Sequence, residues 1–317
     1  MTQLPSQNKV IVFGATGFVG RELLRITPSS TNFQFVFVSR THLRCSNEQR
    51  NIEFVVTDLE DEVAVSNLIS EQCVIINLIY SKEGATENYR WAKRLSKIAV
   101  MNNCKRLIHL STTSTYGRPR DLLVTELTKT NPRTPYECIK HTIDDIFIER
   151  FEGSDSTLII LKPTAIFGAG GMNLLKMYNE ICSEFRFLTF IKSKMNSKRN
   201  AHLIPVRDVV EVILFFIERP VSEKIETFII SRDKCARTYG EVEDEMRKIL
   251  NGSRPRRSGF PLPIWFTEIA LFLRGVSDYK VKTIYSGQKL LDNGYQQEDD
   301  WFTSCLVEAI ESFKRSQ

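Results

Sequence analysis

Histidine is scarce in this chain: its 317 residues include four, and they are scattered along the sequence. Cysteine occurs seven times, an odd number, and no two cysteines are spaced as a C-x-x-C pair. Neither residue type forms a pattern of zinc ligands or a disulfide framework. We therefore expect no metal site, and reduced thiols of the kind typical of a cytoplasmic protein.

Long apolar runs are also missing. The first nine residues lack the apolar core of a signal peptide. The most apolar late stretch, residues 260–273, is too short to cross a bilayer and contains Glu268. We interpret it as a buried or interface helix, with attachment to a membrane surface as the alternative. A net charge of +5 is too small and too dispersed to indicate a nucleic-acid partner.

The first half of the chain alternates between two patterns. Short apolar runs predict strands at residues 10–13, 35–38, 52–56, 74–78, 107–110 and 158–161. Helical periodicity predicts helices at residues 17–27, 61–72, 84–103 and 135–152. Repeated strand–helix units with wholly apolar strands are typical of a parallel sheet covered on both faces. The predicted fold class is α/β, with a doubly wound parallel sheet to which a helix at 207–218 and a strand at 228–230 return.

Three glycines mark the first strand-to-helix turn: Gly14, Gly17 and Gly20. Glycine at such positions permits a tight turn and lets backbone N–H groups approach a phosphate. The positive end of the following helix dipole then faces the anion. An ordinary tight turn would also tolerate these glycines, but the preceding strand favours a dinucleotide phosphate site.

The end of the second predicted strand bears on which dinucleotide would bind. An acidic residue here would hold an unphosphorylated ribose, but the chain has Ser39 and Arg40. An arginine fork is well matched to a 2′-phosphate, so the sequence favours NADP over NAD. Asp58 and Leu59 close the third strand, where Asp58 is either a helix cap or a contact to the adenine edge.

Hydroxyl and amine side chains gather in two later stretches. Thr112 follows the fifth predicted strand, and Tyr136 and Lys140 lie four apart on one helix face. A neighbouring ammonium and an oxidised nicotinamide would lower the pKa of a tyrosine from about 10. Such a tyrosine can exchange the proton of an alcohol or ketone as hydride moves. We expect Thr112 to hold the same substrate oxygen in line.

With these residues in place, the sequence resembles the extended short-chain dehydrogenase/reductases, which include nucleotide-sugar epimerases, dehydratases and reductases. The resemblance covers almost the whole chain. It rests on the glycine turn, on Asp58 and Leu59, on the Thr112–Tyr136–Lys140 set, and on segments 162–168 and 203–209. It implies a Rossmann-type sheet, a smaller C-terminal substrate-binding lobe and hydride chemistry.

The resemblance also implies a set of site residues. The expected catalytic residues are Thr112, Tyr136 and Lys140. The expected cofactor contacts are Gly14, Thr16, Gly17, Phe18, Val19, Gly20, Ser39, Arg40, Asp58, Leu59, Leu78, Asn88, Lys140, Pro163 and Ile166. The expected substrate contacts are Thr113, Tyr116, Asn173 and Arg207.

Three features depart from the family pattern. Residues 78–80 read Leu-Ile-Tyr where the family usually has Leu-Ala-Ala, so bulky side chains crowd the ribose side of the cofactor. Lys162 replaces the usual arginine but keeps its charge. No Arg-x-Gly-Asp segment that grips sugar-nucleotide phosphates is found, and the arginines at 254, 256 and 257 are either substitutes or a solvated loop.

The leading hypothesis is an NADP-dependent reductase or epimerase that acts on a secondary alcohol or ketone, at C4 of a nucleotide-linked sugar. One alternative is a reductase of a steroid-like or flavonol-like ketone, for which residues 260–273 would supply an apolar pocket. Another is a non-catalytic NADP-sensing protein, which would not need Tyr136 and Lys140. Dehydration is disfavoured because Thr113 and Ser114 follow Thr112 where dehydratases have an Asp-Glu pair.

We expect residues 1–167 to form the dinucleotide-binding domain, with return segments near 202–232. Residues 168–201 and 233–317 are expected to form the substrate-binding lobe. The expected partners are a small-molecule substrate and a second copy of the chain in a homodimer, with no nucleic acid and no membrane span.

Overall fold

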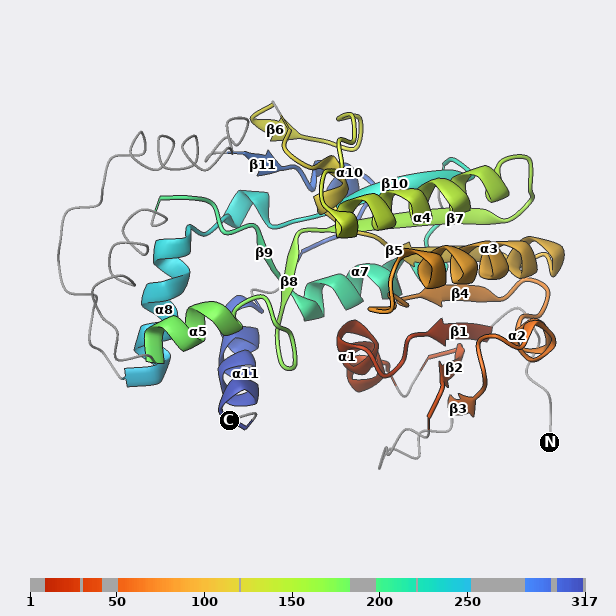
Figure 1. Ribbon diagram of the computed structural model, residues 1–317, viewed down its shortest axis with the longest axis horizontal. Coiled ribbons are helices and arrows are strands. Elements are labelled where there is room, and N and C mark those ends of the chain that lie inside the picture. The colour runs from red at the N-terminus through yellow and green to blue at the C-terminus, as the bar shows by residue number, and fades with distance from the viewer. Residues whose placement is uncertain are drawn as a thin grey trace. The chain divides into compact units, whose positions relative to one another are not determined.

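The computed structural model describes residues 9–28, 31–41, 51–119, 121–182, 198–220, 222–251, 283–297 and 301–315. The chain divides into two compact units (Figure 1). The first consists of Met1–Thr115, Arg133–Lys162 and Val210–Phe228, and the second of Tyr116–Pro132, Pro163–Val209 and Ile229–Gln317. Each unit is described separately below.

A seven-stranded sheet organises the first unit, in the order β10-β7-β5-β4-β1-β2-β3. Its strands are β1 (Lys9–Phe13), β2 (Gln34–Ser39), β3 (Ile52–Val56), β4 (Val74–Asn77), β5 (Arg106–Leu110), β7 (Thr157–Pro163) and β10 (Ile225–Ile230). The pairs from β3 through β7 are parallel. The strand order reverses direction at β1, and the predicted doubly wound α/β fold is confirmed.

Helices pack on this sheet because their apolar faces match alternate strand residues. One core cluster joins strand residues such as Ile11, Ile75 and Leu107 to Leu95 and Phe147. The helices that contribute are α2 (Glu62–Leu68), α3 (Ala85–Met101) and α4 (Pro135–Phe151). The long helices α3 and α4 also lie against each other (Figure 1). The other helices of this unit are α1 (Phe18–Ile26) and most of α7 (Val206–Glu218).

The third predicted strand is followed by a shorter helix than expected. The prediction of a helix over 61–72 is wrong at its C-terminus, because α2 ends at Leu68. Ile69 is extended, and the side-chain amide of Asn102 donates to the carbonyl oxygens of Ser66 and Ile69. These bonds satisfy carbonyls that the next helical turn would otherwise have used.

The second unit holds shorter elements. Two strand pairs, β8 (Ala165–Phe167) with β9 (Leu203–Pro205) and β6 (Leu123–Val124) with β11 (Ile284–Tyr285), are parallel and were not predicted from the sequence. A core cluster gathers α5 (Leu175–Cys182), α8 (Tyr239–Asn251) and α11 (Phe302–Arg315). The helix α10 (Gln288–Asp292) and the 3-10 turn at Asp233–Cys235 (η3) also belong to this unit, whereas the 3-10 turn at Thr113–Tyr116 (η2) begins in the first unit and ends in the second. Among the described residues no helix is long and apolar enough to span a membrane.

Candidate active site

The turn between β1 and α1 is packed too closely for side chains. Gly14 has φ of +94°, and a Cβ there would lie 3.0 Å from the carbonyl carbon of Leu78. A Cβ on Gly20 would lie 2.3 Å from the carbonyl oxygen of Gly14. The backbone N–H of Gly17 donates to that same oxygen at 3.0 Å, and Gly17 is the N-cap of α1. A glycine turn of this shape at a helix N-terminus fits the pyrophosphate of a dinucleotide.

A pocket of about 230 Å³ opens beside this turn in the first unit. Its lining residues come from the carboxyl ends of β1, β2, β3 and β4 and from α3: Gly14, Thr16, Gly17, Val38, Ser39, Arg40, Asp58, Leu59, Glu60, Leu78, Ile79, Tyr80, Ser81, Glu87, Asn88 and Trp91. Nine of the expected cofactor contacts are among these residues. The structure therefore brings together much of the site that the sequence predicts.

The polar residues at the ends of β2 and β3 have definite local roles. The hydroxyl of Ser39 donates to the carbonyl oxygen of Thr41 at 2.6 Å, while Arg40 is exposed at the pocket. Asp58 accepts from the N–H of Glu60 at 2.9 Å, and Asp61 is the N-cap of α2. The alternative that Asp58 caps that helix is therefore wrong, which leaves its carboxylate at the pocket.

Asn88 fixes the loop that leads into α3. Its amide nitrogen donates to the carbonyl oxygens of Ser81 and Gly84, and its side-chain oxygen accepts from the N–H of Ser81. Asn88 is 3% exposed. Its contact with the pocket is thus combined with a structural role that holds the segment after β4 in place.

Tyr136 and Lys140 are positioned by the start of α4. Thr134 and Glu137 form a reciprocal capping box, and Pro135 occupies the first turn, so the helix begins immediately before Tyr136. Tyr136 is 42% exposed, whereas Lys140 is 5% exposed. Thr112 follows β5 and is 9% exposed, with its Oγ1 3.2 Å from Oγ of Ser114.

The electrostatics of Tyr136 differ from the expectation. Burial raises the pKa of the Tyr136 phenol, and hydrogen bonding with the Thr112 side chain opposes this less strongly. Lys140 is not among the groups that shift this pKa, and its Nζ donates to the carbonyl oxygen of Leu110 at 2.9 Å. Burial lowers the pKa of Lys140 to about 8, although Asp144 acts in the opposite direction. Lys140 thus loses its charge more readily than a solvated lysine.

Asp144 is a buried hub that the sequence analysis missed. It lies one helical turn after Lys140 and accepts from the Ser111 hydroxyl at 2.8 Å. Lys162 Nζ lies 3.1 Å from the same carboxylate oxygen. Burial raises the pKa of Asp144, but His109, Lys162 and Ser111 together hold that pKa below its ordinary value. The ammonium of Lys162, the residue that replaces the usual arginine, is thus paired with a carboxylate inside the protein.

His109 extends this buried group, through Asn77, to Trp91, which lines the pocket. The Oδ1 of Asn77 accepts from the indole N–H of Trp91 at 3.1 Å, which fixes the orientation of the Asn77 amide. The amide nitrogen of Asn77 therefore donates to Nδ1 of His109 at 3.1 Å. Neutral His109 then carries its proton on Nε2, which lies 3.5 Å from Asp144. Burial lowers the pKa of His109, which favours this neutral form. The spacing of these residues in the sequence gave no signal of the network.

Tyr80 lies between the pocket and the predicted catalytic pair. Its ring lines the pocket and makes an edge-to-face contact with Tyr136, with centroids 5.1 Å apart and an interplanar angle of 77°. Lys140 Nζ lies 5.2 Å from the centroid of the same ring. The bulk expected at residue 80 is therefore directed at the two side chains that are predicted to be catalytic.

Several predicted site residues belong to the second unit and are described within it. Tyr116 is 1% exposed and packs with Val124, Ile229 and Tyr285. The side chain of Asn173 donates to the carbonyl oxygen of Ile166 at 2.6 Å. Pro163 is buried.

The Arg207 guanidinium, also in the second unit, stacks 3.4 Å above the ring of Trp301. Thr113 belongs to the first unit and is 5% exposed. The substrate and cofactor roles expected of these residues stay predictions. The apolar stretch 260–273 and the arginines at 254, 256 and 257 lie outside the described residues.

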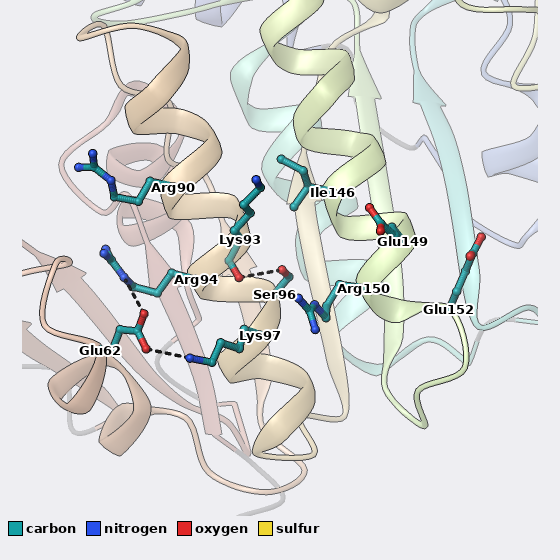
Figure 2. A pocket seen from close by; sticks show the side chains of 10 residues that line it. All are labelled: Glu62, Arg90, Lys93, Arg94, Ser96, Lys97, Ile146, Glu149, Arg150 and Glu152. Atoms are coloured by element: carbon teal, nitrogen blue, oxygen red, sulfur yellow. Dashed lines mark hydrogen bonds and ion pairs between the residues drawn. The ribbon is translucent and has the colours of Figure 1, made fainter.

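A second hollow of the first unit has a different character. A groove of about 770 Å³ runs between α3 and α4 and is lined mainly by charged side chains (Figure 2). Glu62 of α2 lies 3.2 Å from Lys97 and 3.7 Å from Arg94, so part of this charge is paired. None of the predicted site residues lines this groove. Among the described residues there is no cluster of three or more side chains suited to a metal ion.

The sheet order, the glycine turn and the pocket at the strands' carboxyl ends define a Rossmann-type dinucleotide-binding fold. Residues 10–231 match the model of the NAD dependent epimerase/dehydratase family. The chain belongs to that family, as the resemblance predicted.

The curated relatives share little sequence identity with the chain. The chain is 24% identical over 181 residues to "Probable UDP-arabinose 4-epimerase 3" of Arabidopsis thaliana, covering 50% of this chain and 44% of that protein. It is 21% identical over 233 residues to an ADP-L-glycero-D-manno-heptose-6-epimerase of Cupriavidus pinatubonensis, covering 67% and 70%. The chain thus spans less than half the length of the UDP-arabinose 4-epimerases that it matches.

Solved structures agree on the fold. The enzyme WbmH of Bordetella bronchiseptica, in complex with NAD+, superposes with a TM-score of 0.69 at 15% identity, covering 97% of this chain and 98% of that one. The UDP-Glc/GlcNAc 4-epimerase of Campylobacter jejuni gives a TM-score of 0.68 at 16% identity, covering 97% and 99%.

Proposed function

We propose that the protein is a nicotinamide-dinucleotide-dependent enzyme that epimerises C4 of a nucleotide-linked sugar. The observation that carries this is the grouping of Thr112, Tyr136 and Lys140 in the same unit as a glycine-turn pocket suited to a dinucleotide. Membership of the epimerase/dehydratase family and the 4-epimerase names of the curated relatives support the choice of reaction.

Tyr136 is the proposed acid/base. Its phenol takes the proton of the substrate hydroxyl during oxidation and returns a proton to the same oxygen during reduction. Hydrogen bonding with the Thr112 side chain lowers the pKa of the phenol, which supports Thr112 as the proposed contact to the same substrate oxygen. The bound cofactor supplies the acceptor and donor of hydride. Because burial raises the pKa of Tyr136, the free side chain is held as a phenol.

Lys140 has two roles in this proposal. Its ammonium has donors left after its bond to Leu110, and these can hold the ribose next to the nicotinamide. Its charge also favours the phenolate of Tyr136 when the two approach. Asp144, one turn along α4, raises the pKa of Lys140 against the effect of burial. It therefore helps keep the ammonium charged near neutral pH.

NADP is the proposed cofactor form, although the bound cofactor named in the WbmH structure is NAD+. The end of β2 has no acidic residue to hold a free ribose 2′-hydroxyl. Arg40 lines the pocket from that strand end and is free to meet a phosphate. The substrate is proposed to be a nucleotide sugar, with Arg207 of the second unit as a candidate phosphate contact.

Incubation with a panel of UDP-hexoses and UDP-pentoses, followed by proton NMR of the sugar products, tests this function. We expect interconversion of one 4-epimer pair with no net consumption of added NADPH or NADP+. Net oxidation of NADPH by a ketone without epimerisation would instead indicate the reductase alternative. Cofactor binding without turnover on any substrate would indicate the non-catalytic sensor.

A further inference from the structure

The backbone around Tyr80 is held on both sides of the residue. The N–H of Leu78 donates to the carbonyl oxygen of Phe13 at 2.9 Å. On the other side, Ser81 exchanges hydrogen bonds with the side chain of Asn88 at 2.9 and 2.8 Å. These hydrogen bonds involve Leu78, Ser81 and Asn88, so rotation of the Tyr80 side chain breaks none of them.

Tyr80 lines the pocket and also contacts the Tyr136–Lys140 pair. On one side it forms part of the wall of the 230 Å³ pocket, whose lining includes neither Tyr136 nor Lys140. On the other side it touches Tyr136 edge-to-face at 5.1 Å and lies 5.2 Å from Lys140 Nζ. A volume of 230 Å³ is below the roughly 300–1,000 Å³ typical of sites that enclose drug-sized ligands. It suits the adenosine half of a dinucleotide better than the whole molecule.

We propose that Tyr80 is a side-chain gate between the adenosine pocket and the Tyr136–Lys140 pair. The adenosine half of the cofactor binds with the ring in place. The nicotinamide half reaches Lys140 only when the ring rotates away, which breaks the aromatic contact with Tyr136 and the cation–π contact with Lys140. Tyr80 thus acts as a specificity-determining residue that lowers the affinity for the complete dinucleotide relative to its adenosine half.

The gate rests on the proposed dinucleotide site, so its test compares ligands that contain only the adenosine half with complete dinucleotides. Calorimetry would measure binding of 2′,5′-ADP and of NADP+, and of ADP and NAD+, to wild-type protein and to Tyr80→Ala. We expect Tyr80→Ala to bind the dinucleotides about tenfold more tightly, which corresponds to ~1.4 kcal/mol. In the wild type this free energy is spent on breaking one aromatic pair and one cation–π contact. Binding of the adenosine half-ligands should stay within about twofold of wild type on the same scale.

Tyr80→Phe is the matched control because it keeps the ring and removes only the hydroxyl. It should bind all four ligands as the wild type does. If Tyr80→Ala weakens dinucleotide binding, the ring is a platform for the cofactor and the gate is overturned. Equal changes for half-ligands and dinucleotides also overturn it, while leaving the dinucleotide site intact. No binding of any ligand to wild-type protein overturns both the gate and the proposed function.

A measurement on wild-type protein makes the test independent of how Tyr80→Ala folds. In protein with labelled tyrosine, the Tyr80 ring signals are identified by their loss in Tyr80→Phe. Nuclear Overhauser contacts between the Tyr80 and Tyr136 rings should persist with 2′,5′-ADP and disappear with NADP+. Contacts that persist with both ligands would overturn the gate.

Discussion

Lys162 Nζ lies 3.1 Å from Oδ2 of Asp144, and both side chains are buried, at 6% and 2% exposure. The two residues belong to different elements, β7 and α4, so their ion pair joins the helix that holds Tyr136 and Lys140 to the sheet. Removing one partner of such a pair leaves the other charge uncompensated in the interior.

Asp144→Asn is therefore expected to lower the free energy of unfolding by about 3–5 kcal/mol, as measured by urea denaturation at pH 7. Asp145→Asn is the matched control, because the neighbouring carboxylate is 60% exposed and should contribute about 0–1 kcal/mol. Combining Asp144→Asn with Lys162→Met should recover part of the loss, since the double variant leaves neither charge. Similar effects at 144 and 145 would contradict a buried ion pair.

Lys140 sets a pH limit on the proposed reaction. Burial lowers its pKa from 10.5 to about 8, so the ammonium is present below that pH and lost as the pH rises through it. We expect kcat/KM to fall above about pH 8. Asp144 opposes the lowering, so Asp144→Asn should move the fall to lower pH. A profile that stays flat to about pH 9.5 would show that the Lys140 charge is not required.

The lowered pKa of Lys140 also affects stability, which should rise over the pH range in which activity falls. Between about pH 8 and 10.5 the unfolded chain keeps a proton on Lys140 that the folded protein has lost. The contribution of Lys140 to the free energy of unfolding therefore increases with pH across this window. Lys140→Met, which has no proton to lose, should remove this dependence.

Tyr136→Phe should reduce turnover by ~10²–10⁴-fold, because the phenol is the proposed proton donor and acceptor. Dinucleotide binding should be nearly unchanged, since the substitution removes only a hydroxyl and keeps the ring that contacts Tyr80. Tyr239→Phe in α8 of the second unit is a control for the loss of a tyrosine hydroxyl outside the first unit. More than about a tenth of wild-type activity in Tyr136→Phe would exclude Tyr136 as the acid/base.

Gly20→Ala should abolish dinucleotide binding. The added Cβ would lie 2.3 Å from the carbonyl oxygen of Gly14, so the turn between β1 and α1, the predicted phosphate site, must move. Gly153→Ala is the matched control: its Cβ would meet no atom within 4 Å, although φ of +74° makes the substitution strained. Gly153→Ala should therefore lose some stability but keep its cofactor affinity, as calorimetry can show. Equal affinities for the two variants would argue against a phosphate site at this turn.

Local patterns were sufficient for the fold. Apolar runs of strand length and helical periodicity depend on nearby residues, and they predicted β1 through β5 and α4 closely. The end of α2 could not be found in this way, because Asn102, far along the chain, supplies the bonds that stop it at Leu68. The pairing of β6 with β11 also joins segments too short to show a period.

The candidate site also contains residues that local patterns predict and residues that only contacts between distant segments reveal. Gly14, Tyr136 and Lys140 could be found because short motifs carry their chemistry. Asp144 could not, because its partners Ser111 and Lys162 come from β-strand ends that only the folded sheet brings to α4. The crowding at Tyr80 was visible as a departure from the family pattern, but its contact with Tyr136 depends on packing between the β4 end and α4.

Arg40 provides the test of cofactor preference. It lines the pocket at the end of β2 and is exposed, so its contact with a 2′-phosphate would be charge-assisted yet partly screened by solvent. Arg40→Ala should weaken NADPH binding by about tenfold and NADH binding by less than about twofold.

Because screening grows with ionic strength, the preference of the wild type for NADPH should also shrink between low and high salt. Lys105→Ala, a change of equal charge at a residue that does not line the pocket, is the control for net charge. Equal losses of NADPH and NADH in Arg40→Ala would show that Arg40 does not recognise the 2′-phosphate, and the absence of an acid at the end of β2 would then need another explanation.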